Sequence, residues 1–116
     1  MASVTLYHNP RCSKSRAALA LLEEQGAEVE VVRYLDTPLD EAGLRDLLRR
    51  LGRPAAELVR RGEAEYKAVG LGPDSDEDQL VAALAAHPKL MERPVAVVGK
   101  RAVIGRPPEN VLELLP

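Results

Sequence analysis

Apolar and polar residues alternate over the first few positions of the chain and then change to a helical spacing. Residues 3–8 read Ser-Val-Thr-Leu-Tyr-His, and this period-two pattern is typical of a strand with one buried face. From about residue 13 to residue 25 the apolar side chains recur three and four positions apart, which predicts a helix. Alternation returns over residues 28–34. The start of the chain therefore predicts a strand, a helix and a second strand.

The middle of the chain carries helical patterns interrupted by glycine and proline. Four leucines between positions 44 and 51 fall at i, i+3, i+4 and i+7, which predicts an amphipathic helix with one buried stripe. Pro54 is expected to start a short helix that runs through Arg61, because proline is tolerated in the first helical turn. Residues 62–75 are predicted to be irregular, and a further helix is predicted over about residues 76–86.

The last part of the chain predicts a hairpin and a final helix. Residues 94–98 have a strand pattern, and residues 102–104 suit its hairpin partner after a tight turn. A short helix is predicted over residues 107–115. The order is then β-α-β, a helical insertion at about residues 40–87, and β-β-α, which is the outline of a thioredoxin-like α/β fold with a mixed sheet. We expect one domain over residues 1–116.

Composition excludes several classes of function. The chain has 116 residues, with 16 basic and 18 acidic side chains, and this balance argues against a dedicated nucleic-acid binder. With no Phe, no Trp and three Tyr, it also lacks a stacking platform for single strands. Its one cysteine excludes an internal disulfide and a cysteine-based zinc site. No apolar run approaches the ~20 residues of a membrane span, and no signal-peptide pattern opens the chain. We therefore expect the protein to be in the cytoplasm, a reducing compartment.

The candidate for chemistry is the single cysteine, Cys12, which lies between the first strand and the first helix. Unpaired N–H groups and the positive end of the helix dipole favour a thiolate there, and also a bound oxyanion. Bringing the pKa of a thiol from about 8.5 to about 7 requires roughly 2 kcal/mol, whereas a helix terminus supplies about 0.3–1 kcal/mol, and about 2 kcal/mol at best. The helix alone is therefore marginal and nearby cations should contribute; the local candidates are Arg11, Lys14 and Arg16, with His8 if it is protonated.

The residues around Cys12 narrow the chemistry further. A lone cysteine is often a small buried apolar residue, but the polar neighbours Arg11 and Ser13 favour a reactive thiol. Ser15 stands where a Cys-x-x-Cys pair would have its second thiol, so a redox cycle would need an external thiol. Position 18 is Ala, which excludes a phosphatase-type loop with its arginine at that spacing. With only two histidines in the chain and no protease signature around them, a Cys–His protease site is disfavoured.

Several separated segments carry motifs of one known family. They are Tyr7-His8-Asn9-Pro10-Arg11-Cys12, Leu58-Val59-Arg60-Arg61, Tyr66 to Leu71, Gln79-Leu80, His87-Pro88, Arg93-Pro94 and Gly105-Arg106-Pro107. Taken in order along nearly the whole chain, these segments resemble the glutaredoxin-linked arsenate reductase family (ArsC and Spx-like proteins), whose fold is thioredoxin-like.

The resemblance implies a set of site residues. It implies a nucleophilic cysteine, three arginines that bind the substrate anion and two residues that support the thiol: Cys12; Arg60, Arg93 and Arg106; His8 and Ser15. It also implies a cis peptide bond between Arg93 and Pro94. The chemistry of arginine fits this role, because arginine stays charged and holds phosphate-like oxyanions bidentately.

The resemblance further implies a cytoplasmic enzyme that reduces arsenate to arsenite through a thio-arsenate adduct on Cys12. Arsenate would be the substrate, glutathione the co-substrate and glutaredoxin the protein that completes the reduction. No bound cofactor, metal, nucleic acid or membrane is expected, and the chain is expected to be a monomer.

Two other functions stay open at this point. A glutathione-linked thiol-transferase on the same fold would act on disulfides, and such a substrate does not require three arginines. A Spx-like regulator of transcription would not be an enzyme, and that group typically carries a Cys-x-x-Cys redox switch. Ser15 speaks against the regulator.

Overall fold

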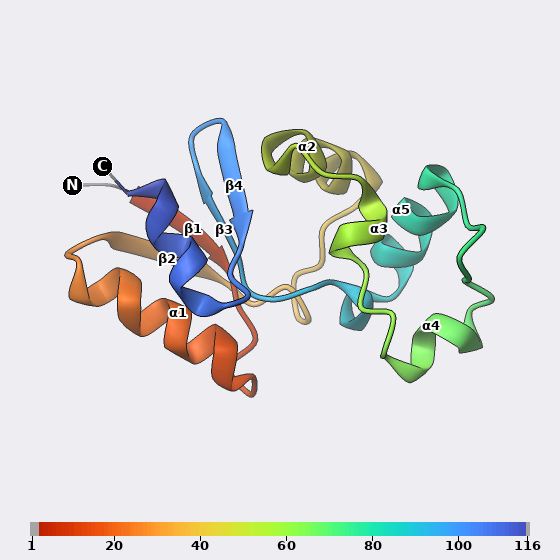
Figure 1. The fold of residues 1–116 in the computed structure, drawn as a ribbon, viewed down its shortest axis with the longest axis horizontal. Coiled ribbons are helices and arrows are strands. Elements are labelled where there is room, and N and C mark those ends of the chain that lie inside the picture. Colours follow the sequence, from red (N-terminus) through yellow and green to blue (C-terminus); the bar gives the residue numbers. More distant parts are fainter. Residues whose placement is uncertain (1–2, 116) are drawn as a thin grey trace. The chain divides into compact units, whose positions relative to one another are not determined.

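The computed structural model describes residues 3–115 of the chain and divides them into two compact units. The first unit is formed by the two ends of the chain, up to Thr37 and from Arg93 onward. The second unit is the intervening segment, Pro38–Glu92, and the helical insertion expected at about residues 40–87 falls within it (Figure 1). The expectation of a single domain over residues 1–116 stays a prediction.

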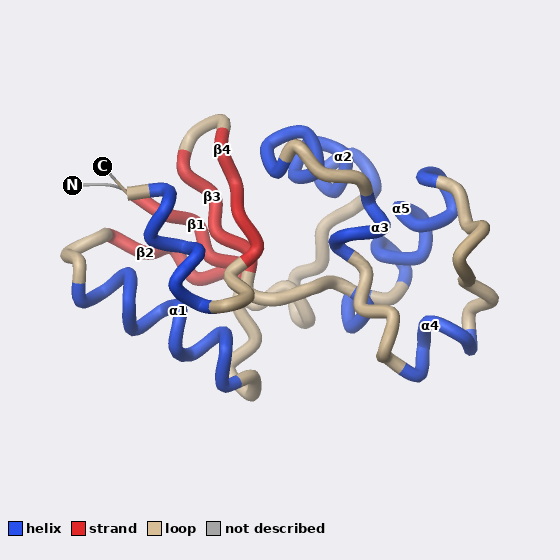
Figure 2. The backbone as a smooth tube through the Cα atoms, in the orientation of Figure 1, coloured by secondary structure: helices blue, strands red, loops and turns tan. Residues whose placement is uncertain are grey.

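The first unit is built on a mixed four-stranded sheet. Its strands are β1 (Ser3–Tyr7), β2 (Glu28–Val32), β3 (Val95–Val98) and β4 (Arg101–Ile104), in the spatial order β2-β1-β3-β4 (Figure 2). β1 pairs with β2 in parallel, and the β1–β3 and β3–β4 pairs are antiparallel. The α/β sheet and the hairpin expected from the sequence are therefore confirmed.

Two helices pack on one face of this sheet. They are α1 (Ser13–Glu24) and the 3₁₀ helix η2 (Pro108–Leu114), which occupies the place of the predicted final helix. The alternation in the strands explains the packing, since it puts every second apolar side chain on the same face. The buried cluster consists of Val4, Leu6, Ala18, Leu22, Ala96, Val111 and Leu114.

The second unit is helical. It contains α2 (Glu41–Leu51), α3 (Ala55–Leu58), α4 (Ala64–Ala68), α5 (Glu77–Ala86) and the 3₁₀ turn η1 (Pro88–Leu90). Of the leucine stripe of α2, Leu44, Leu47 and Leu48 are buried as predicted and Leu51 is half-buried, and α2 packs against α5. Among residues 3–115 no helix has the length and apolar character needed to cross a membrane.

The prediction of a helix from Pro54 through Arg61 is wrong for its second half. α3 ends at Leu58, and the next residue, Val59, forms an antiparallel bridge with Met91. Arg60 therefore lies on extended chain instead of a helix. Met91 lies more than 30 residues after Val59 in the sequence, so no local pattern predicts this bridge.

The prediction of an irregular segment over residues 62–75 is also wrong, because the structure forms α4 there. Gly62 and Gly70 flank this helix and do not interrupt it. Gly70 adopts a φ of 82° and its N–H donates to the carbonyl of Lys67 at 3.0 Å, which ends the helix. None of the five residues of α4 is buried. The helix therefore has no buried apolar stripe from which the sequence pattern could predict it.

Gly105 follows β4, and its contacts predict that this position accepts no side chain. A Cβ atom there would lie 2.8 Å from Cγ of Pro94 and 2.9 Å from Cγ1 of Val111. We expect Gly105→Ala to lower the free energy of unfolding by about 1–3 kcal/mol, the usual cost of overpacking, as measured by urea denaturation. Gly62→Ala is the matched control, since a Cβ atom at Gly62 meets nothing within 4 Å. Equal stability of the two variants would contradict the prediction.

Candidate active site

Cys12 occupies the N-cap position of α1. Its backbone is extended, with φ −94° and ψ 123°, and its carbonyl accepts a bond from the N–H of Arg16 at 3.0 Å. The Cys12 N–H donates to the carbonyl of Asn9 at 3.0 Å, which closes the turn after β1. The sulfur is thereby fixed at the end of the helix where free N–H groups and positive partial charge are found.

The surroundings of Cys12 favour its ionised form. Burial raises the pKa of the thiol, but the backbone N–H groups of Ser15 and Lys14 lower it, and the charge and hydrogen bond of Arg93 lower it further. The net result is a Cys12 pKa below that of an ordinary thiol. Cys12 is only half-buried, so a reagent can reach this thiolate.

The register of the sheet brings Arg93 and Arg106 to the same place. Val95 pairs with Tyr7, the last residue of β1, and also with Ile104, the last residue of β4. Arg93 precedes Val95 by two residues and Arg106 follows Ile104 by two, so both arginines lie just beyond the end of β1. A guanidinium N–H of Arg106 donates to the carbonyl of Arg93 at 3.2 Å.

Both of these arginines precede a cis proline. The Arg93–Pro94 bond is cis, as expected, and the Arg106–Pro107 bond is cis as well. The second cis bond was not foreseen, because the residues after β4 were interpreted only as a helix start. Gly105 links the two segments, since its N–H donates to the carbonyl of Pro94 at 2.8 Å.

His8 and Ser15 form a buried pair beside Cys12. Nδ1 of His8 lies 2.6 Å from Oγ of Ser15, and this oxygen also accepts a bond from the N–H of Asn9 at 3.0 Å. Burial lowers the pKa of His8, and the positive charges of Arg33 and Arg16 lower it further. His8 is therefore neutral at pH 7, and the positive charge that a protonated His8 was expected to add comes from arginine instead.

Arg60 belongs to the second unit, where carboxylates surround its guanidinium. Nη1 of Arg60 lies 3.1 Å from Oε2 of Glu63, and Nε lies 3.9 Å from Oε1 of Glu92. Nη1 also donates to the carbonyl of Lys89 at 3.4 Å, and the backbone N–H of Arg60 donates to the carbonyl of Leu90 at 2.7 Å. Arg60 is thus held firmly, and its charge is offset within its own unit.

The structure adds residues that the sequence did not assign to the site. Asn9 was interpreted only as the end of a strand, but its Oδ1 accepts the N–H of Arg11 at 3.0 Å and its backbone holds both Cys12 and Ser15. Arg16 donates from Nη1 to the carbonyl of Pro10 at 2.9 Å. An Asn-Pro pair directly before a helix was the available signal for this turn.

The arrangement in the first unit is suited to nucleophilic attack on an anion. A thiol with a lowered pKa lies at a helix start, the Arg93 and Arg106 guanidinium groups lie just beyond the neighbouring end of the sheet, and a buried histidine of lowered pKa is hydrogen-bonded to Ser15. Among residues 3–115 no three His, Cys, Asp or Glu side chains group in a way that could hold a metal ion. The fold and the cysteine together define a thioredoxin-like protein with a single reactive thiol.

Comparison with known proteins identifies the family. The model of the ArsC family matches residues 7–114, and the chain belongs to that family. The structure called arsenate reductase from Vibrio cholerae superposes with a TM-score of 0.94 at 46% identity and covers 98% of each chain.

Two relatives show how close the family members are in sequence. The arsenate reductase of Neisseria meningitidis serogroup A is 48% identical over 117 residues, which is 99% of this chain and 100% of the relative. The Escherichia coli K12 protein YfgD, described as uncharacterized, is 55% identical over 114 residues, which is 97% of this chain and 96% of the relative. The family and the thioredoxin-like fold inferred from the motifs are confirmed.

The pH dependence of Cys12 alkylation should reveal the contribution of Arg93. Because only the thiolate reacts, a lowered Cys12 pKa moves the midpoint of the rate against pH below that of a cysteine in a short peptide. Arg93→Gln removes a charge that lowers this pKa, so the midpoint should move to higher pH. Iodoacetamide labelling followed by mass spectrometry measures this midpoint for Cys12 alone, since the chain has one cysteine.

Arg101→Gln is the control for this experiment. Arg101 pairs with Val98 at the far end of the β3–β4 hairpin, and its loss should leave the midpoint in place. A wild-type midpoint equal to that of the peptide would contradict the proposed ionisation.

Proposed function

We propose that this protein is an arsenate reductase that acts in the cytoplasm through Cys12. The observation that carries the proposal is the hydrogen bond of the Arg93 guanidinium to Cys12, whose pKa is lowered, together with the bond of the Arg106 guanidinium to the Arg93 carbonyl. Support also comes from relatives named arsenate reductase at 48% and 46% identity over nearly the whole chain.

The first step is attack of the Cys12 thiolate on arsenic of dihydrogen arsenate. A sulfur–arsenic bond forms and one arsenic–oxygen bond breaks, and the departing hydroxide takes the remaining arsenate proton and leaves as water. Arsenic remains in the +5 state. Arg93 and Arg106 stabilise this step, because charge-assisted hydrogen bonds from guanidinium groups offset the repulsion between the thiolate and the incoming anion.

The following steps reduce the adduct with external thiols. With uptake of one proton, the glutathione thiol forms a bond to arsenic and displaces one arsenic-bound oxygen as water. A thiol of glutaredoxin then attacks the glutathione sulfur; the sulfur–arsenic bond breaks, its electron pair reduces arsenic to the +3 state, the thiol proton passes to an arsenic-bound oxygen, and the two thiols end as one mixed disulfide. Water finally cleaves the Cys12–arsenic bond, which releases arsenite and returns Cys12 as thiolate. The external thiol is required because the chain has no second cysteine. The reaction needs no bound cofactor.

His8 and Ser15 support the thiol by fixing the turn that carries it. Ser15 Oγ joins the side chain of His8 to the backbone of Asn9, and Asn9 in turn accepts the N–H of Cys12. Their role is therefore to position the sulfur. Neither is needed as a proton carrier in the steps above.

Removal of the thiol should abolish the activity. Cys12→Ser replaces the nucleophile with a hydroxyl group that is not ionised at neutral pH. In an assay with arsenate, glutathione and glutaredoxin, we expect arsenite formation by this variant to fall to the level without enzyme. Arsenite formation that survives the loss of Cys12 would overturn the proposal, and activity on a mixed disulfide alone would favour the thiol-transferase.

Removal of Arg60 should impair the activity without destroying it. If Arg60 binds the anion, Arg60→Ala should lower kcat/KM for arsenate roughly 10- to 100-fold, the value of one charge-assisted hydrogen bond. Arg61→Ala, an exposed neighbour of the same charge, is the control and should change kcat/KM less than about two-fold. Equal effects of the two substitutions would exclude Arg60 from the anion site.

A further inference from the structure

The chain needs an electron donor that it does not contain, and its charges indicate what kind of donor it accepts. Cys12 is the only cysteine of the 116 residues, so the second thiol must come from solution. Around Cys12, residues 8–16 carry three cationic side chains and no carboxylate. An anionic thiol is therefore attracted to this end of the first unit, whereas a cationic thiol is repelled.

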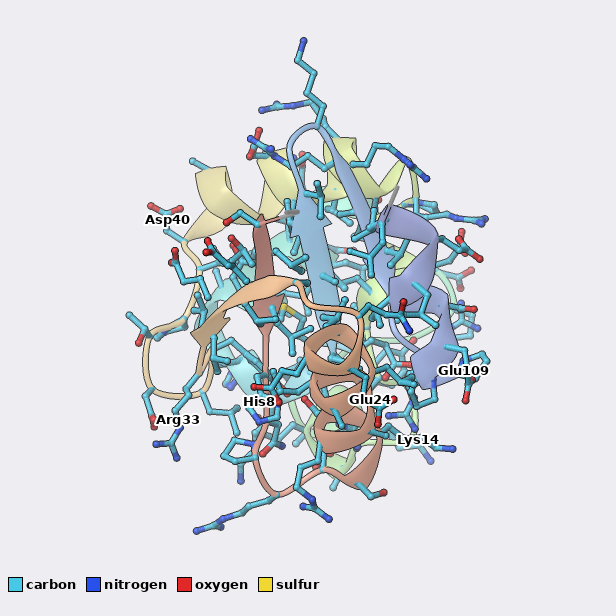
Figure 3. The ribbon with its side chains drawn as sticks, turned by 90° about the vertical axis from the view of Figure 1, so that its left-hand side faces the viewer. His8, Lys14, Glu24, Arg33, Asp40 and Glu109 are labelled. Atoms are coloured by element: carbon cyan, nitrogen blue, oxygen red, sulfur yellow. The ribbon has the colours of Figure 1, made fainter. Side chains whose placement is uncertain are left out.

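Two arginines outside the proposed oxyanion site flank His8. The N–H of His8 donates to the carbonyl of Val32 at 2.8 Å, so the next residue, Arg33, leaves β2 beside the point where His8 leaves β1. Arg16 reaches the same turn from α1, because its Nη1 donates to the carbonyl of Pro10. The positive charges of both arginines lower the pKa of His8. Figure 3 shows His8, Arg33 and Lys14 in the lower half of the view, with Arg33 to the left of His8 and Lys14 to its right.

Arg16 and Arg33 lie near Cys12 in the chain and in the sheet without being the groups that act on its thiol. Arg93 lowers the pKa of the Cys12 thiol, whereas Arg16 and Arg33, after burial, lower that of His8. Arg16 stands one helical turn after Cys12, because its N–H donates to the carbonyl of Cys12 at 3.0 Å. The side chains of Arg16 and Arg33 are also accessible, since both are exposed. Arg33 forms a solvent-exposed ion pair with Asp36, with Nε 3.5 Å from Oδ2.

The geometry points to Arg16 and Arg33 as the residues that bind the carboxylates of a small anionic thiol, whose sulfur then reacts at Cys12 or at the arsenic bound to it. This inference rests on the proposed function for the arsenate reaction and extends it to the choice of thiol. It assigns the oxyanion to Arg93 and Arg106, and the thiol carboxylates to a separate pair. Five N–H donors per guanidinium allow Arg16 to keep its bond to Pro10 while it binds a carboxylate.

The first experiment needs no arsenate. The Cys12 thiolate attacks a disulfide, forms a mixed disulfide and releases the other half as a thiolate, which mass spectrometry follows directly. Glutathione disulfide supplies an anionic reagent and bis(2-hydroxyethyl) disulfide a neutral one. The ratio of the two rates should fall roughly two- to five-fold in Arg33→Gln and in Arg16→Gln, the range of an exposed ion pair. Added salt should lower the wild-type ratio as well.

Two controls separate charge from fold. Arg16→Lys keeps the charge and should keep most of the ratio, whereas Arg16→Gln, which removes the charge and keeps an N–H donor, should lose it. Arg101→Gln removes one arginine at the far end of the β3–β4 hairpin and should leave the ratio unchanged. Ratios of Arg16→Gln and Arg33→Gln equal to that of the wild type would overturn the inference.

The second experiment repeats the comparison during arsenate reduction. With glutaredoxin held at one fixed concentration, it measures kcat/KM for glutathione and for 2-mercaptoethanol at saturating arsenate, and the same two arginine variants should lower the ratio of these values. No arsenite from the wild type with either thiol would refute the proposed function, and the disulfide experiment would still decide the role of Arg16 and Arg33. Arsenite formation with the same ratio in wild type and variants would refute the inference and leave the proposed function intact.

Discussion

The stabilisation of an ionised sulfur at the start of α1 is the constraint on which the rest of the first unit depends. Burial opposes the charge of Cys12, while two backbone N–H groups and the Arg93 guanidinium favour it. The backbone N–H groups of Ser15 and Lys14 lower the pKa most, and Arg93 adds to their effect. The sheet register makes this possible, because the residues just outside β3 and β4 are placed beyond the end of β1. The hydrogen bonds of Asn9 with Cys12 and with Ser15 then fix the turn that carries the sulfur.

The sequence was a good guide wherever one short segment determines its own structure. The strands, α1, the leucine stripe of α2 and α5 all have local periodicity, and α5 begins with a capping box between Asp76 and Gln79. The site was predictable to the same extent. Cys12 could be placed at a helix start from local pattern alone, whereas the assignment of Arg93 and Arg106 needed the family motifs. Nothing in the spacing of residues 93 and 106 shows that β3 and β4 bring them together.

Features that depend on distant partners were missed for a physical reason. Val59 pairs with Met91, and this pairing turns the chain at Arg60 from helix to extended structure. The two carboxylates on Arg60 come from Glu63, at helical spacing, and from Glu92, which the same pairing brings near. The protonation state of His8 likewise depends on Arg33, which lies at the end of another strand. Charge and burial at each of these positions are properties of the fold and not of the neighbouring sequence.

The two units contribute different electrostatic environments to the proposed reaction. In the first unit the Arg93 guanidinium favours the ionised form of Cys12, and the Arg106 guanidinium is bonded to the Arg93 carbonyl. In the second unit Arg60 is accompanied by Glu63 and Glu92, so the group as a whole is negative. An arginine whose charge is already offset attracts a further anion less strongly than one without such partners. Any additional anion at Arg60 would have to replace a carboxylate of its own unit, Glu63 or Glu92.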